Sequence, residues 1–191
     1  MKATMSVDKL YIDGKMYTTE NLKTLPEALQ PENLATKYND DTCWFWRKES
    51  FLSNFHPSPF SEGGHNFNCV EQYFTASRAK MFNDQEALDK ILKTKDPSVM
   101  KQTSVKGYND REWKSIAKDI MKRGVELKFE QNPTLLEKLK KTGNRTICEA
   151  SPSDKFWGVG MSMHNKDILD RSKWGENHLG KILMEVRQKL S

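Results

Sequence analysis

The chain has 191 residues, with 31 basic and 26 acidic side chains and a formal net charge of +5. That length, with 36% hydrophobic residues, suffices to bury the core of one domain and excludes a disordered chain. No apolar run approaches the roughly 20 residues that span a bilayer, and residues 1–8 lack the apolar segment of a secretory signal. We therefore expect no membrane association and a cytoplasmic location, or a nuclear one if the source is eukaryotic.

The cysteines and histidines predict no structural metal and no disulfide framework. Cys43, Cys69 and Cys148 are odd in number and widely spaced, and no CxxC pair occurs. A reducing compartment is the default for such a chain. The four histidines show neither HExxH nor HxH spacing, so we expect no metal site, and we identify no motif for a bound cofactor.

The first 41 residues read as an N-terminal extension, with the main domain following as residues 42–191. Residues 10–17 alternate around Asp13-Gly14, a typical hairpin turn. Residues 19–40 are polar and interrupted by prolines, too few for a core of their own. Residues 43–46 then predict a short aromatic strand, and the prolines and glycines of residues 57–64 predict a loop.

Helical signals dominate from residue 68 onward. Asn68 and Glu71 have the spacing of a capping box, Asp84 can cap a second helix, and Asp96-Pro97 begins a third. Residues 110–132 carry one apolar face, and Leu135, Leu136 and Leu139 mark a helix that Gly143 closes.

A strand candidate at residues 146–149 precedes a long loop, residues 150–176, and loops of this length are often functional. In the last predicted helix, apolar residues from Leu179 to Leu190 recur at the spacing of a buried helix face. The fold class predicted is mainly α-helical, α+β with a few short strands.

The basic excess lies in residues 111–191. It is compatible with a phosphate-bearing ligand, although composition alone favours the interpretation as solvated helix faces.

Three acidic residues lie close to apolar or aromatic residues in the sequence. Glu71 lies beside apolar neighbours at a helix start, Glu149 ends an apolar strand, and Asp154 opens the DKFWG loop. Converging carboxylates suit cleavage of a glycosidic bond, where one group handles a proton and another stabilises an oxocarbenium-like transition state. The alternatives are a capping box for Glu71 and a turn for Asp154, and spacing alone does not show convergence.

Several aromatic and basic residues are candidate ligand contacts. Trp157 and Trp174 lie in glycine-containing loops, where either ring can stack on a base. Trp113 lies on the apolar helical face and fits a core position, although it too can stack, as can Phe55 and Tyr73. Arg78 and Lys128 can hold phosphate or be solvated.

Seven segments, in order and spacing, resemble the NADAR superfamily, also called the YbiA-like fold. The resemblance covers residues 42–190 and is carried by LSNF (52–55), VEQYF (70–74), KFEQN (128–132), EAS (149–151), DKFWG (154–158), WGENHLG (174–180) and LMEVR (183–187). It implies a compact, mostly helical fold and a hydrolase of the N-glycosidase type. Two substrates are associated with such proteins, a phosphorylated ribosylaminopyrimidine of riboflavin biosynthesis and ADP-ribose linked to the guanine amino group.

The resemblance also assigns roles to positions of this chain. Glu71 matches the motif glutamate and is the leading catalytic candidate, with Asp154 and Glu149 at two further acidic positions. The candidate substrate-binding residues are Asn54, Phe55, Arg78, Trp113, Lys128, Trp157, Gly158 and Asn177. Asn177 and Gly180, which match the N-x-L-G turn, also fit structural roles.

Arg78 departs from the family pattern, because many members carry lysine there, seven residues past the motif glutamate. A guanidinium cannot form a Schiff base with opened ribose. Either water attacks directly, or Lys80 or Lys128 takes that role, or activity is altered.

The favoured reading is a hydrolase that releases ADP-ribose from ADP-ribosylated guanine, either the base adduct or nucleic acid. The ribosylaminopyrimidine is the alternative substrate. Two other readings remain open: a non-catalytic module that binds ADP-ribose or NAD, and an interaction protein whose extension docks a partner. The sequence identifies no protein partner.

Overall fold

The structure is a computed structural model that describes residues 3–6, 9–12, 15–17 and 34–191. Strands β1 (Ala3–Ser6), β2 (Lys9–Ile12) and β3 (Lys15–Tyr17) form an antiparallel sheet. Ile12 pairs with Lys15, as the predicted hairpin requires, while its Asp13-Gly14 turn lies outside the described residues. Among the described residues, no helix is both long enough and apolar enough to cross a membrane.

The central sheet has the order β4 (Thr36–Tyr38), β5 (Thr42–Phe45) and β8 (Thr146–Glu149). β4 and β5 are antiparallel, whereas β5 and β8 are parallel, with Phe45 opposite Glu149. Parallel neighbours need a crossover connection, and most of the helices lie in it. β4 falls within the residues assigned to the extension, and the boundary after residue 41 stays a prediction.

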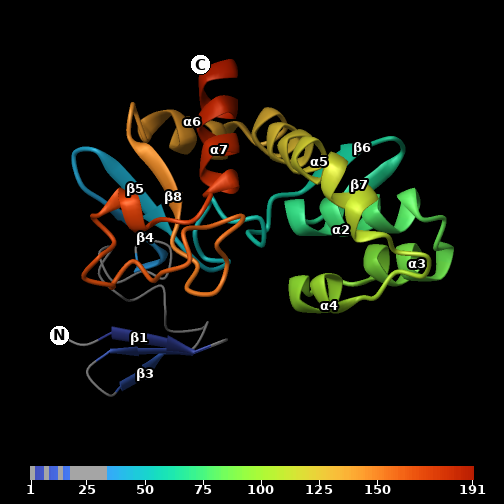
Figure 1. The fold of residues 1–191 in the computed structure, drawn as a ribbon, viewed down its shortest axis with the longest axis horizontal. Helices are drawn as coiled ribbons and strands as arrows, with labels where there is room; N and C mark the ends of the chain where they lie inside the picture. The colour runs from blue at the N-terminus through green and yellow to red at the C-terminus, as the bar shows by residue number, and fades with distance from the viewer. Residues whose placement is uncertain (1–2, 7–8, 13–14, 18–33) are drawn as a thin grey trace.

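The fold is mainly helical with a few short strands, which confirms the predicted α+β class. The helices divide between two sides of the molecule (Figure 1). α2 (Val70–Met81), α3 (Gln85–Lys93) and α4 (Pro97–Gln102) form one cluster. α7 (His178–Lys189) packs on β8 at the other side, next to α6 (Pro133–Lys141). α5 (Asp110–Glu130) contacts both α2 and α7 and so joins the two sides.

The contact between α2 and α5 is close because Gly124 has no side chain. A Cβ there would lie 2.8 Å from Cδ1 of Tyr73 and 3.2 Å from Cγ1 of Val70. Trp113, Ala117 and Met121 continue the buried face of α5, as the apolar periodicity predicts. This contact holds the first turn of α2 against the interior.

Two local predictions are wrong. Cys69, not Asn68, is the N-cap of α2, and Asn68 donates its backbone N–H to Oε1 of Gln72. The predicted capping box is therefore absent, because the carboxyl of Glu71 is buried instead of turning back to the cap. Residues 57–64 are not all loop either, since β6 (Phe60–Glu62) and β7 (His65–Phe67) form a hairpin across two positive-φ glycines.

The predicted loop at residues 150–176 has only a short 3₁₀ turn, Arg171–Lys173. It is nevertheless tied down by backbone hydrogen bonds. Glu176 N–H donates to Lys155 O at 2.7 Å, and Leu179 N–H donates to Trp157 O at 3.0 Å. Residues 154–158 are thereby fixed beside the start of α7.

Candidate functional site

One cavity of about 330 Å³ collects most of the predicted site residues. We call it the Glu71 cavity. The cavity is lined by residues 53–55, the first three turns of α2, the residues from the end of α4 into α5, and the loop after β8. It lies at the carboxyl end of β8, next to β5, and this end of parallel strands is where ligands bind in open α/β sheets.

Glu71 lies in the first turn of α2 and is only 8% exposed. Its backbone N–H donates to Asn54 O at 3.1 Å. Burial raises the pKa of the Glu71 carboxyl to about 7, although the positive charges of Lys101 and Arg78 oppose the rise. A carboxyl that titrates near neutrality is suited to proton transfer at physiological pH.

Glu149 enters the same cavity from the end of β8. Its Oε2 atom is buried and has no hydrogen-bond partner. Burial and the negative charges of Asp154 and Glu71 raise the pKa of Glu149 to about 7, with Lys101 opposing. After burial, the strongest charge effect on the Glu71 carboxyl comes from the cation Lys101, and the strongest on the Glu149 carboxyl comes from the carboxylate of Asp154.

Asn177 and Gly158 hold Glu149 in place from outside the cavity. Asn177 Oδ1 accepts the Glu149 N–H at 3.1 Å, and Asn177 Nδ2 donates to Ile147 O at 2.9 Å. A Cβ on Gly158 would lie 2.6 Å from Glu149 O. Both residues were predicted to bind substrate, and the structure places them behind the site.

Asp154 plays the structural role foreseen for it and lines the cavity as well. Its Oδ1 accepts the N–H groups of Phe156 at 2.9 Å and Trp157 at 2.8 Å, a typical Asx turn. The turn holds the backbone of Phe156 and Trp157, and the side chain of Trp157 lines the cavity.

Aromatic rings form one wall of the Glu71 cavity. Trp157 meets Phe74 edge to face, with centroids 5.6 Å apart, and Phe74 meets Trp113 at 4.9 Å. Trp113 is 5% exposed, so it is both a core residue and a wall of the cavity. Such a wall offers a stacking surface to a base or sugar.

Three basic residues line the other part of the cavity: Arg78, Lys101 and Lys114. Arg78 lies two turns after Glu71 on α2, and its Nη2 donates to Thr103 O at 3.3 Å. Nζ of Lys101 lies 5.9 Å from the centroid of the Phe55 ring. The sequence analysis did not identify Lys101 and Lys114, because no local sequence pattern predicts how α4 and α5 pack against α2.

Unsatisfied polar atoms concentrate at this cavity. Among the described residues, four buried side-chain atoms have no hydrogen-bond partner, and three of them belong to cavity residues: Asn54 Oδ1, Arg78 Nε and Glu149 Oε2. Buried polar groups are normally paired, so these three are suited to pairing with a bound ligand.

Lys128 lies outside the cavity. Its side chain is fully buried, and Nζ donates to Ser53 O at 2.9 Å. Burial lowers the pKa of its ammonium to about 7. The sequence analysis predicted that Lys128 binds phosphate, but the structure does not present its ammonium group to the cavity. Lys80 does not line the cavity either.

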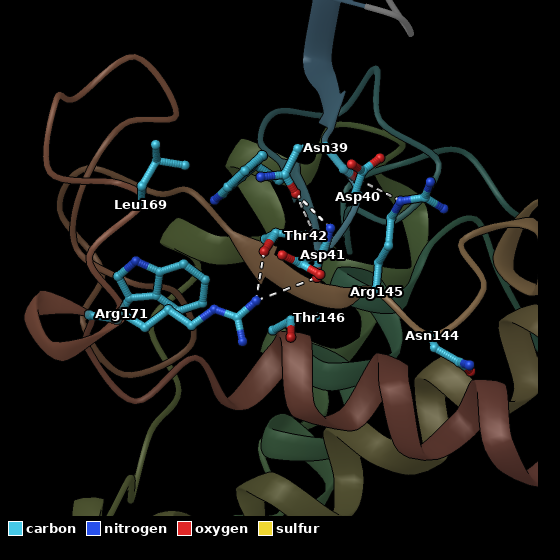
Figure 2. Close-up of a pocket in the computed structure, with 11 residues that line it drawn as sticks. Asn39, Asp40, Asp41, Thr42, Asn144, Arg145, Thr146, Leu169 and Arg171 are labelled. Carbon is cyan, nitrogen blue, oxygen red and sulfur yellow. Dashed lines mark hydrogen bonds between the residues drawn. The ribbon is translucent and has the colours of Figure 1, made fainter.

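A larger hollow of about 740 Å³ lies at the opposite, amino-terminal ends of β5 and β8 (Figure 2). Its arginines are engaged with the chain itself. Arg171 Nη2 donates to Thr42 Oγ1 at 2.9 Å, and Arg145 Nε donates to Asn39 O at 2.7 Å. Trp174, a candidate stacking residue, lines this hollow and not the Glu71 cavity. Because it contains none of the carboxyls with raised pKa, we take the Glu71 cavity as the candidate site.

No group of three or more histidine, cysteine or acidic side chains in the described part of the chain is arranged to hold a metal ion.

Comparisons with known proteins identify the family and the fold of this chain. The NADAR domain family matches residues 44–191. N-glycosidase R617 of Acanthamoeba polyphaga mimivirus is 36% identical over 75% of this chain and 84% of its own length. Riboflavin biosynthesis protein VVA0006 of Vibrio vulnificus is 32% identical over 73% of this chain, but over only 35% of its own length. The NMR structure of the E. coli protein YbiA superposes with a TM-score of 0.64 at 25% identity, covering 83% of this chain and 90% of YbiA. The resemblance inferred from the seven segments is confirmed, and the chain belongs to the NADAR family.

Proposed function

We propose that the Glu71 cavity hydrolyses the bond between ribose C1 and nitrogen in ADP-ribosylated guanine, releasing ADP-ribose. The reaction class rests on the family and on relatives named N-glycosidase, including R617 and E. coli YbiA at 36% and 30% identity. The chain is accordingly a hydrolase of N-glycosyl bonds. The proposal adds to this reaction class the identity of the substrate, ADP-ribosylated guanine.

The observation that carries the proposal is the pairing of two proton-transfer groups with different surroundings in one cavity. The charged group that acts most strongly on Glu71 is the cation Lys101, whereas the one that acts most strongly on Glu149 is the carboxylate of Asp154. Cations favour the ionised form and anions favour the protonated form. Of the two, Glu71 is therefore the better base and Glu149 the better acid.

The proposed reaction assigns each proton. The Glu71 carboxylate takes a proton from water as the water oxygen bonds to ribose C1. The C1–N bond breaks, and the proton of Glu149 passes to the departing nitrogen. In the transition state each of the two groups carries partial negative charge, because its proton is only partly transferred, and this charge stabilises the positive charge that develops on the ribose ring.

Water attacks directly in this scheme. Arg78 stands where the family pattern leads us to expect lysine, and its guanidinium is not a nucleophile. Its unpaired Nε instead suits a phosphate oxygen, since arginine binds phosphates through several donors at once.

The features of the cavity fit the two ends of the proposed substrate. Arg78 and Lys101 are suited to the diphosphate, and the wall formed by Trp157, Phe74 and Trp113 is suited to stacking on a base. The basic excess of residues 111–191 is compatible with a nucleic acid carrying the modification.

A phosphorylated ribosylaminopyrimidine is the second candidate substrate. One observation favours it: the Vibrio vulnificus relative, of which this chain covers about a third, is named a riboflavin biosynthesis protein. This substrate has the same type of ribose–nitrogen bond but a single phosphate, so it needs fewer cations than the cavity offers.

The test uses an oligonucleotide with ADP-ribosylated guanine, with chelator present, and follows release by mass spectrometry. Three proteins are compared: wild type, Glu71→Gln, and Glu137→Gln as a matched control on the exposed face of α6. We expect free ADP-ribose and unmodified DNA from wild type and the control only. Turnover by Glu71→Gln at the wild-type rate would refute the role of Glu71.

The same preparations distinguish the rival functions. Release only from the ribosylaminopyrimidine would move the assignment to the second substrate. Calorimetric binding of ADP-ribose without cleavage of either substrate would indicate a binding module.

A further inference from the structure

Lys128 is a buried basic group that the proposed reaction does not use. Its side chain is fully buried in α5, Nζ donates to Ser53 O at 2.9 Å, and Nζ lies 5.2 Å from the centroid of the Phe129 ring. In the described part of the chain, Ser53 O is its one hydrogen-bond acceptor. Burying an ammonium group is expensive unless it is well paired, so the core alone does not explain a lysine here.

The contact with Ser53 leads directly into the Glu71 cavity. The next carbonyl along the chain, Asn54 O, accepts the backbone N–H of Glu71 at 3.1 Å. The side chain of Asn54 is held by a 3.1 Å contact from Nδ2 to Sδ of Met121, which leaves Oδ1 unpaired at the cavity. Residues 53–55 therefore connect Lys128 on α5 with the first turn of α2.

We propose that Lys128 is a positioning residue: it anchors residues 53–55 from behind, so that Asn54 and Glu71 keep their orientation toward the substrate. The inference rests on the proposed function for its catalytic consequence. It replaces direct phosphate binding by Lys128 with an action through the Ser53 and Asn54 carbonyls.

The proposal predicts that stability and activity separate on substitution. Methionine has nearly the length of lysine and needs no hydrogen bond, and it removes the desolvation cost of an ammonium buried without an ion-pair partner. Ser53 O keeps a donor in the variant, because it also accepts the backbone N–H of His56 at 3.1 Å. Lys128→Met should therefore remain folded but lose the anchor. Small displacements of reacting groups reduce rates steeply.

The experiment compares wild type, Lys128→Met and Lys122→Met. Lys122 lies on the same helix, and its ammonium pairs with Glu185 at the surface, 2.8 Å away, so it controls for the loss of a lysine on α5. Urea unfolding, amide hydrogen exchange of the free proteins, and kcat and KM on the ADP-ribosylated oligonucleotide are measured.

For Lys128→Met we expect an unfolding free energy at or above the wild-type value. Exchange should be faster in residues 51–56 and 69–74 and unchanged elsewhere. We expect kcat to fall about tenfold or more, while KM stays within about twofold because Arg78 and Lys101 are untouched. Lys122→Met should match wild type in local exchange, kcat and KM.

Three results would overturn the proposal. Unchanged exchange in both segments would show that Lys128 anchors nothing, and faster exchange throughout with lower stability would show a general structural role. A raised KM with unchanged kcat would show that Lys128 binds phosphate directly. If wild type cleaves nothing, the proposed function fails, whereas the exchange measurements still decide the anchoring without substrate.

Discussion

The sharpest test of the site concerns the stability of Glu71→Gln across pH and needs no substrate. Burial raises the pKa of Glu71 from 4.5 to about 7, and a rise of that size corresponds to about 3 kcal/mol. The folded state holds the proton more tightly than the unfolded chain does. This contribution to stability is therefore fully present below about pH 4.5 and is lost as the pH rises through 7.

Glutamine cannot ionise, so the variant avoids that loss. We expect the unfolding free energy of Glu71→Gln, relative to wild type, to increase by about 3 kcal/mol between pH 4.5 and pH 8. Urea denaturation at several pH values measures this difference directly. Glu137→Gln, at an exposed position, should give a nearly constant difference. A constant difference for Glu71→Gln as well would refute the reasoning, because the carboxyl would then not be destabilised by burial.

Three further predictions concern the pH profile and the packing behind the site. The plot of kcat/KM against pH should be bell-shaped around pH 7, since Glu71 must be ionised and Glu149 must be protonated. The Glu149→Gln variant should lose the alkaline limb of this plot. An unchanged alkaline limb would exclude Glu149 as the acid. Gly124→Ala should lower the unfolding free energy, measured in urea, by about 1–2 kcal/mol. The reason is that the close contact of the new Cβ with Tyr73 outweighs the roughly 1 kcal/mol of helix propensity gained. A variant as stable as wild type would show that α2 shifts to make room for the Cβ. Gly180→Ala should lower the unfolding free energy by about 3 kcal/mol or more, because its Cβ would collide with the backbone of β8. A decrease of less than about 1 kcal/mol would mean that the start of α7 moves to relieve the collision.

Local signals predicted the helices well. Asp84 and Asp96 cap their helices as expected, accepting backbone N–H groups of Ala87 and Ser98, because capping depends only on residues nearby in sequence. The Asn68–Glu71 pair failed for the opposite reason. Its spacing fits a cap, but tertiary packing turned the glutamate inward.

The hairpin of β6 and β7 was missed because its strands have three residues each and prolines precede them. Adjacent glycines are a recognised hairpin signal, so Gly63-Gly64 could have indicated it.

The candidate site was predictable in its acids and aromatics, through the resemblance, but not in its cations. Glu71, Glu149 and Trp157 do meet in one cavity. Lys101 could not be found, because its position depends on how α4 packs against α2. The sequence could not distinguish Lys128 from a surface lysine, because burial of an ammonium group is decided by long-range packing.

The parallel pairing of β5 with β8 has a consequence for how the protein folds. Thr42 and Thr146 lie side by side, although about a hundred residues separate them in the chain, so closing this pair is entropically demanding. Helices made of local contacts form faster than such long-range pairings. In refolding experiments, the helical signal should return first and the ability to bind ligand last, since Glu149 reaches its place only when β8 docks. A nascent or truncated chain that has its helices but not this pairing would be folded in part and have no working site.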